Sequence, residues 1–328
     1  MFSLQQRIQT PHSAFISCCW LSSQTIACGS LEGELVLLQN SPSSNQFTHH
    51  QTIEATHKKA SLISLHPFTA SPSALLSTSF DGAVRVWASH EDQWDLKISN
   101  EEFVPVDLMT TACNGAGMFV CARTDGSVGI YSDKGQEKAS ISNSSQLQEV
   151  GALSNCATGS RNCPITALSL PLATAARQQL AIGKNNGIVL LADLTSQRTL
   201  QTLNGHEGRR VQALSTSPQN SSLLLSGAQD GLVCLWDGRA GCLAASFAFE
   251  SGAGADKVWI SKVQFNPAAP ESFFLATSAS GAVKYWDLRA GAVAHSWESV
   301  EGLAEVAPAG DKVCVVGERE VCLYRVPN

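Results

Sequence analysis

The chain has 328 residues, of which 44% are hydrophobic and 15% are charged, and its formal net charge is −6. This length exceeds the usual size of one domain, and the hydrophobic content is enough to build a large core. Its acidic balance argues against direct binding of nucleic acid, because proteins that bind the phosphate backbone usually present clustered positive charge.

The N-terminal ten residues are polar and lack the hydrophobic stretch of a signal peptide, and no hydrophobic run reaches the length of a membrane span. Most of the eleven cysteines lie in hydrophobic stretches, as is typical of reduced, buried thiols in an intracellular protein. No two Cys-x-x-Cys pairs are present, so we predict no metal site. The sequence therefore predicts a soluble intracellular protein without membrane insertion.

One pattern recurs along the chain: a hydrophobic strand, a turn built on Asp-Gly or a related pair, and a further strand that often ends in Trp. In chain order, its copies span residues 25–38, 75–87, 119–131, 180–191, 224–237, 275–287 and 313–324. Asp-Gly between alternating hydrophobic residues predicts a β-hairpin, because glycine tolerates a positive φ angle. The turn glycines are Gly33, Gly82, Gly126, Gly187, Gly231 and Gly281, and Arg319-Glu320 replaces the turn in the seventh copy.

The two ends of the chain are expected to meet. Residues 2–8 can supply the strand that the last copy lacks, and this pairing would close a ring and cover an exposed sheet edge. We therefore predict one domain over residues 1–328. Residues 132–162 lie in the longest interval between turn glycines and are rich in Ser, Gln, Asn and Gly, which predicts an outer strand and a flexible surface loop.

The dipeptides Trp236-Asp237 and Trp286-Asp287, with Gly205-His206, resemble the signature of the WD-repeat β-propellers, and the resemblance covers nearly the whole chain. It implies an all-β, seven-bladed propeller closed by an N-terminal strand. In that family a buried hydrogen-bonded chain joins a histidine, a serine or threonine, the turn aspartate and the tryptophan. The matching structural residues are His57, Ser79, Asp81 and Trp87, then His206, Asp230 and Trp236, where Ala228 or Ser226 stands at the serine position, and finally Trp286.

No catalytic arrangement can be assembled from the sequence, since the histidines are explained by the repeat or lie in loops and strand ends. We expect a non-catalytic scaffold that binds several proteins in one complex, with no cofactor and no small-molecule substrate. Residues 226–241 and 257–274 are similar to the small WD-repeat nucleoporin of the Y-shaped nuclear pore complex. Residues 217–239 are also similar to the WD subunit of an arginine-methyltransferase complex, the methylosome. These resemblances imply a nuclear-envelope, nuclear or cytoplasmic location.

A second hypothesis rests on the motif Trp-Asp-x-Arg, which occurs at residues 236–239 and 286–289. It resembles the motif through which receptor-type WD proteins dock the adaptor of a cullin-type ubiquitin ligase. Arg239 and Arg289 are therefore candidate partner-binding residues. The alternative interpretation is that each arginine caps its turn and pairs with a nearby carboxylate.

Three prolines, Pro67, Pro218 and Pro267, predict where first strands end. Eight residues before each of them, the chain should enter its innermost strand at the top rim, beside a central channel. Tryptophan and arginine are enriched among interface hot spots, so this position supplies candidate contact residues. Trp259 is the foremost candidate, with a core tryptophan between blades as the alternative. The positions are Lys59, Arg210 and Trp259, with Ala14 and Glu102 expected in the first and third copies.

Overall fold

The computed structural model describes most of the chain, and every regular element in the part described is a strand. Within that part, no helix is long and apolar enough to cross a membrane. The prediction of an all-β protein is therefore confirmed. The described residues are 3–9, 14–44, 46–53, 60–68, 74–90, 93–100, 111–113, 118–122, 128–132, 148–153, 164–170, 179–194, 196, 198–220, 222–249, 258–298, 305–317 and 320–326.

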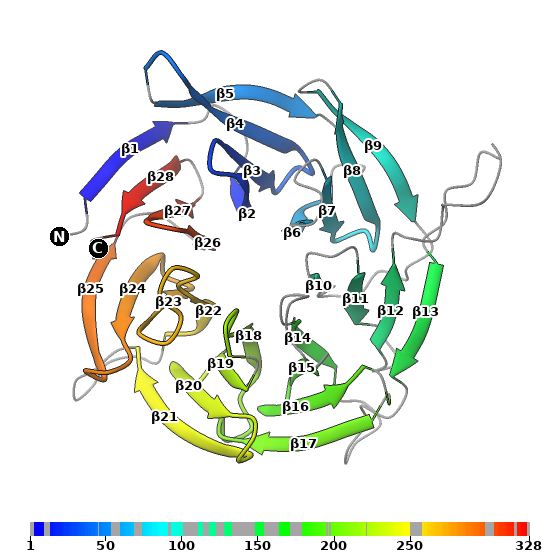
Figure 1. The fold of residues 1–328 in the computed structure, drawn as a ribbon, viewed down its shortest axis with the longest axis vertical. Helices are drawn as coiled ribbons and strands as arrows, with labels where there is room; N and C mark the ends of the chain where they lie inside the picture. Colours follow the sequence, from blue (N-terminus) through cyan, green and yellow to red (C-terminus); the bar gives the residue numbers. More distant parts are fainter. Residues whose placement is uncertain are drawn as a thin grey trace.

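In these ranges the strands form seven four-stranded antiparallel sheets, the blades, which Figure 1 shows as a ring. From the centre outward, the first blade has β2 (Phe15–Ser22), β3 (Thr25–Ser30), β4 (Leu35–Ser41) and β5 (Gln46–Ile53). The next has β6 (Leu62–Pro67), β7 (Ala74–Ser79), β8 (Val84–His90) and β9 (Gln93–Asn100). The third has β10 (Thr111–Cys113), β11 (Met118–Ala122), β12 (Val128–Ser132) and β13 (Gln148–Leu153).

The same order continues around the ring. The fourth blade has β14 (Ile165–Ser169), β15 (Gln179–Lys184), β16 (Ile188–Asp193) and β17 (Arg198–Asn204). The fifth has β18 (Val211–Thr216), β19 (Leu223–Ala228), β20 (Leu232–Asp237) and β21 (Cys242–Ala248). The sixth has β22 (Ile260–Phe265), β23 (Phe273–Ser278), β24 (Ala282–Asp287) and β25 (Ala292–Glu298).

The last blade joins the two ends of the chain. It contains β26 (Glu305–Ala309), β27 (Lys312–Val316) and β28 (Glu320–Arg325), and the N-terminal β1 (Ser3–Gln9) pairs antiparallel with β28. Figure 1 shows the chain termini side by side at this blade. Around the ring, each innermost strand contacts the innermost strands of both neighbouring blades. The predicted seven-bladed β-propeller is the fold that the structure shows.

The predicted hairpins form because glycine occupies the turn between the second and third strands. Five of the predicted turn glycines have φ between 76° and 87°, a left-handed conformation that other residues rarely adopt. The sixth, Gly126, lies outside the described residues. The five are Gly33, Gly82, Gly187, Gly231 and Gly281.

Neighbouring blades pack through small residues on the second strand. An added Cβ at Gly227 would lie 2.5 Å from Cγ2 of Ile260, the first residue of the next innermost strand. An added Cβ at Gly183 would lie 2.7 Å from Cγ1 of Val211. Each glycine therefore leaves a depression that the next blade fills, and this packing fixes the neighbouring blades relative to each other.

The segment 132–162 is only partly described. It contributes Ser132 at the end of β12 and the outermost strand β13, while the remainder lies outside the described residues. The prediction of a surface loop there stays a prediction.

The described cysteines are free thiols, and seven of the eight are buried. Burial raises the pKa of Cys19, Cys28 and Cys234, the last to about 12, with the charge of Asp230 adding to the effect on Cys234. Cys242 is exposed at the start of β21. The expectation of buried thiols therefore fails for Cys242, because β21 is an outermost strand and has a solvent-facing side.

Candidate functional site

The entrances of the innermost strands and the turns between the second and third strands alternate around one face of the ring. In five of the blades the turn donates a backbone N–H to the carbonyl just before the innermost strand, for example Ala279 N to Trp259 O at 2.9 Å. We call this face the rim. Its entrance residues are Ala14, Ser61, Pro164, Arg210 and Trp259, and its turn residues are Leu31, Phe80, Asn185, Gln229 and Ala279.

Trp259 lies at the rim with 51% of its surface exposed. This exposure contradicts the alternative interpretation of a core tryptophan packed between blades. Only its backbone carbonyl takes part in the strand-entrance hydrogen bond, so the indole is not required for that turn. The structure therefore leaves a large aromatic side chain available to a binding partner.

Two further apolar side chains are exposed at the rim, and the sequence analysis missed both. Leu31 is 46% exposed and Phe80 is 47% exposed. The hydroxyl of Ser61 donates to Leu31 O at 2.9 Å and the carbonyl of Ser61 accepts from Phe80 N at 3.0 Å, so Ser61 joins the two turns. A large apolar residue two positions before a turn glycine is the signal that could have identified them.

Arg210 is the rim entrance residue of the blade before Trp259. Its side chain is half-buried, and its Nε and Nη2 atoms have no hydrogen-bond partner among the described residues. Burial lowers the pKa of Arg210 from its ordinary value, and the guanidinium remains charged at neutral pH. The rim thus carries a cation without a described carboxylate beside it.

The prediction of Lys59 as the matching rim residue was wrong in its register. Leu62 begins β6 as Val211 begins β18, so Ser61 is the equivalent of Arg210. Pro67 lies within the paired part of its strand, opposite Leu75, whereas Pro218 follows the end of β18. Counting back from the prolines therefore misaligned the two blades by two residues. Lys59 and Glu102 themselves lie outside the described residues.

The arginines of the two Trp-Asp-x-Arg motifs are exposed. In each motif the aspartate, not the arginine, caps the turn: Oδ1 of Asp237 accepts from Arg239 N at 2.8 Å, and Oδ1 of Asp287 accepts from Arg289 N at 2.8 Å. The Arg239 Nε atom donates to the Ser222 hydroxyl at 2.9 Å. Neither arginine forms an ion pair with a described residue, so the pairing with a nearby carboxylate is not seen in the described part of the chain.

A buried polar chain fixes the blade β18–β21. His206 contacts Asp230 at 2.9 Å through Nδ1 and the Ser226 hydroxyl at 2.7 Å through Nε2. The Trp236 indole N–H donates to the same hydroxyl at 2.7 Å. Ser226, and not position 228, therefore supplies the hydroxyl of this hydrogen-bonded chain. Gly205 is needed beside it, because a Cβ there would lie 2.5 Å from the Trp236 ring.

The blade β6–β9 repeats part of this arrangement. The Trp87 indole donates to the Ser77 hydroxyl at 2.8 Å, while Ser79 bonds to the turn carboxylate of Asp81. The prediction that Ser79 serves Trp87 was wrong, since Trp87 pairs with Leu75 across the sheet and the nearer hydroxyl on that face is Ser77. His57 lies outside the described residues.

Trp286 departs from the pattern. It is buried and stacks on Phe274, with ring centroids 5.9 Å apart, yet its indole N–H has no hydrogen-bond partner among the described residues. Ala276 stands at the position that Ser226 holds in the preceding blade. Trp286 is therefore a packing residue without the polar chain.

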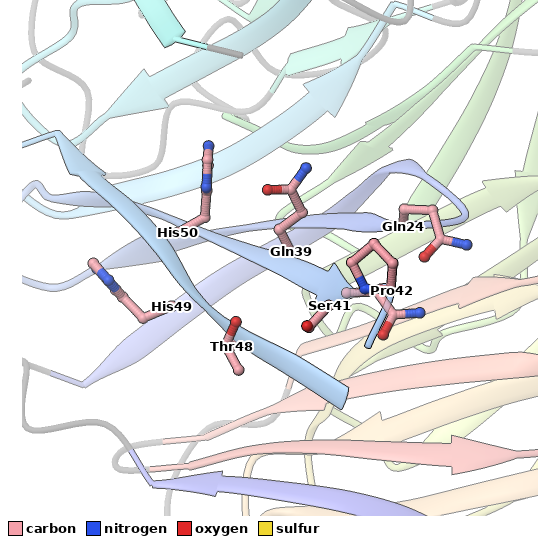
Figure 2. Close-up of a pocket in the computed structure, with 8 residues that line it drawn as sticks. Gln24, Gln39, Ser41, Pro42, Thr48, His49 and His50 are labelled. Carbon is pink, nitrogen blue, oxygen red and sulfur yellow. The ribbon is translucent and has the colours of Figure 1, made fainter. Parts of the chain in front are cut away.

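Figure 2 shows side chains that line a polar hollow at the hairpin β4–β5. This hairpin lies at the end of its blade opposite the rim turn between β3 and β4. Gln24, Gln39, Thr48, His49 and His50 are among the residues that line it. The Nε2 atom of His49 is 2.7 Å from the Thr52 hydroxyl. No group of three or more His, Cys, Asp or Glu side chains in the described part is placed to hold a metal ion. The hollow has no convergent chemistry that would indicate catalysis.

Two comparisons with known proteins address the family. Residues 197–237 match the family model described as WD domain, G-beta repeat. Residues 197–237 therefore form a WD repeat. The matched stretch runs from β17 to β20, so a WD repeat begins on the outermost strand of one blade and ends in the next. The polar chain of His206, Ser226, Asp230 and Trp236 lies within this WD repeat.

The chain is also 42% identical over 67 residues to guanine nucleotide-binding protein subunit beta-like protein 1 of Mus musculus. This match covers 20% of the chain and 20% of the mouse protein. The WD repeat and this relative support a role in protein interactions.

Proposed function

We propose that this WD-repeat protein is a non-catalytic scaffold that binds other proteins through its rim and holds several of them in one complex. The observation that carries the proposal is the exposure of Trp259. An exposed tryptophan without a structural role is uncommon on a soluble surface, and tryptophan is strongly enriched among residues that dominate binding energy.

The rim also suggests the character of the partner. Arg210 and Trp259 occupy equivalent positions in neighbouring blades, so one partner segment can contact both. The Arg210 guanidinium favours an acidic segment, whereas Leu31 and Phe80 offer apolar contacts in other blades. The proposed partner at the rim is therefore an acidic segment that carries apolar anchor residues.

For the complex itself, we propose a structural subunit of the nuclear pore, on the local resemblance of residues 226–241 and 257–274 to a WD-repeat nucleoporin. This proposal implies an intracellular location at the nuclear envelope. The methylosome resemblance of residues 217–239 gives a second complex and a nuclear or cytoplasmic location. The exposed, unpaired Arg239 and Arg289 favour a third, in which the protein is a substrate receptor of a cullin-type ubiquitin ligase.

Affinity purification with mass spectrometry distinguishes these assemblies, because nucleoporins, methylosome subunits and ligase adaptors are different proteins. The double variant Arg239→Ala/Arg289→Ala should retain the main complex if the protein is a structural subunit, and should lose the adaptor if it is a ligase receptor. Retention of the partners by a rim variant, Trp259→Ala with Arg210→Glu, would contradict the proposed use of the rim.

A further inference from the structure

We propose that three neighbouring blades carry a second docking surface, which takes an acidic protein segment with interspersed aliphatic side chains. We call this surface the arginine edge. It lies on the outer wall, at the end of the blades opposite the rim, and its use is independent of the proposed function of the rim. Its residues are Arg198, Leu200, Arg239, Leu243, Arg289 and Val293.

The arginine edge is continuous across the blades. Figure 1 shows β17, β21 and β25 in succession along the circumference. The turn before β21 touches β17, since an added Cβ at Gly241 would lie 3.2 Å from the Gln201 side chain. In the next blade Leu288, which precedes Arg289, packs against the same hydrophobic cluster as Ala245 of β21. A single extended segment can therefore contact all three blades.

The three guanidinium groups face solvent without ionic partners. Arg198, Arg239 and Arg289 are exposed, and none forms an ion pair with any residue in the described ranges. In the closing blade, by contrast, Arg7 pairs with Glu320 and Arg325 pairs with Asp311. Arg198, Arg239 and Arg289 thus lie in three consecutive blades.

Three carboxylates near these arginines are held by their own turns, whereas Glu271 is exposed next to Ser272, whose carbonyl accepts a hydrogen bond from Leu288 N. Asp237 and Asp287 each accept hydrogen bonds from two backbone N–H groups of the turn, and Asp193 accepts one from Ser196. All three aspartates are half-buried, whereas the arginines beside them are exposed. An approaching partner therefore meets the guanidinium groups before these three aspartates.

Aliphatic side chains lie beside the arginines. Leu200, Leu243 and Val293 are exposed to 47%, 45% and 38%. Leu243 and Val293 lie opposite Trp236 and Trp286 in the sheet, and each is followed by a register shift that leaves the outer strand bulged. The blades thus repeat one pair of features, a guanidinium group and an exposed aliphatic residue.

Charge complementarity identifies the occupant. Guanidinium groups bind carboxylates through paired, charge-assisted hydrogen bonds, and exposed aliphatic residues gain from burial under apolar side chains. Because the chain as a whole carries a net charge of −6, a row of unpaired arginines is a local departure from its overall charge. A segment in which carboxylates and aliphatic residues alternate matches both features of the arginine edge.

A fluorescein-labelled peptide in which glutamate alternates with leucine provides the probe, with binding followed by anisotropy. We expect wild-type protein to bind it and the triple variant Arg198→Glu/Arg239→Glu/Arg289→Glu to bind about tenfold more weakly or not at all. A peptide with lysine in place of glutamate should bind the wild type no better than it binds the triple variant. Circular dichroism and thermal melting establish that the triple variant is folded.

Leu96 supplies the matched control, because it is exposed on β9, lies opposite Trp87 as Leu243 lies opposite Trp236, and belongs to a blade outside the arginine edge. Leu243→Ser should weaken binding, whereas Leu96→Ser and the rim variant Trp259→Ala should not. The fluorescence of a bimane label on the exposed Cys242 should also change when the peptide binds. The proposal is wrong if wild-type protein does not bind, if the triple variant binds equally, or if Trp259→Ala abolishes binding and thereby places the peptide on the rim.

Discussion

The indole N–H of Trp20 donates a 2.8 Å hydrogen bond to the carbonyl of Ala307, which lies 287 positions away in the sequence. Trp20 belongs to β2 and Ala307 to β26, the innermost strands of the first and last blades. A second link lies on the circumference, where the Gln6 amide donates to Phe47 O at 2.7 Å and accepts from Phe47 N at 2.8 Å. The first and last blades are therefore joined at both the centre and the outside of the ring.

Deletion of residues 1–9 should remove the outer link and expose the edge of β28. Because an unpaired strand edge can pair with other chains, we expect a lower melting temperature and aggregation. Thermal melting and size-exclusion chromatography measure both effects. A truncated protein that stays monomeric and melts like the wild type would show that β1 is dispensable.

Replacement of Trp87 or Trp236 by alanine should lower the free energy of unfolding by roughly 3–5 kcal/mol, because each removes a large buried side chain and leaves a cavity. Urea denaturation measures the change. Trp259→Ala is the matched control, since this tryptophan is half exposed, and it should melt like the wild type. A large loss of stability in Trp259→Ala would mean that its indole packs in the core.

The sequence predicted the features that depend on a short pattern. In a hairpin turn of the Asp-Gly type the glycine adopts a positive φ angle. The dipeptide alone therefore predicted the turns at Gly82 and Gly231. Trp236 was identified as buried because the repeat places an apolar residue at the end of the third strand.

Features that depend on strand register were not predictable in the same way. Ser77 and Ser79 lie on the same face of β7, and only the pairing of Trp87 with Leu75 decides which hydroxyl the indole reaches. Likewise, Pro67 lies inside the pairing of β6 whereas Pro218 lies beyond β18. A proline fixes local backbone geometry but not its position relative to the strand end, and this led to Lys59 in place of Ser61.

Ser226→Ala should lower the free energy of unfolding by about 1–3 kcal/mol, because it leaves the buried Nε2 atom of His206 and the buried indole N–H of Trp236 without a partner. The opposite substitution, from alanine to serine, can be made at the matching position of the next blade. Ala276→Ser places a hydroxyl near the unpartnered Trp286 indole and should raise stability by up to about 1 kcal/mol. Chemical denaturation measures both variants.

The background Trp286→Phe separates the new hydrogen bond from other effects of Ala276→Ser, since it has no indole N–H to satisfy. The gain should vanish in that background. An equal gain with and without the indole would refute the assignment of Ala276 to the serine position.

Lys262 and Glu305 pair at 2.5 Å between β22 and β26. Burial raises the pKa of Glu305, and the charge of Lys262 opposes this shift. In Lys262→Met that opposition is lost, so the folded-state pKa of Glu305 should rise further above its unfolded value. Because the folded state then holds the proton more tightly, the stability of the variant should decrease as pH rises through that pKa.

Melting temperatures measured from acid to neutral pH test this expectation. The decline with pH should be steeper for Lys262→Met than for the wild type, and the double variant Lys262→Met/Glu305→Gln should remove the difference. Parallel pH profiles of the wild type and Lys262→Met would contradict the coupling between the two residues.

We propose that the rim binds a protein partner through Trp259. The most direct test compares the proteins that copurify with the wild type and with Trp259→Ala, quantified by mass spectrometry, after both have been shown to melt alike. We predict that Trp259→Ala loses at least one abundant partner, with a loss of binding free energy on the order of 2–4 kcal/mol in a purified pair. An unchanged set of partners, recovered in unchanged amounts, would contradict the claim.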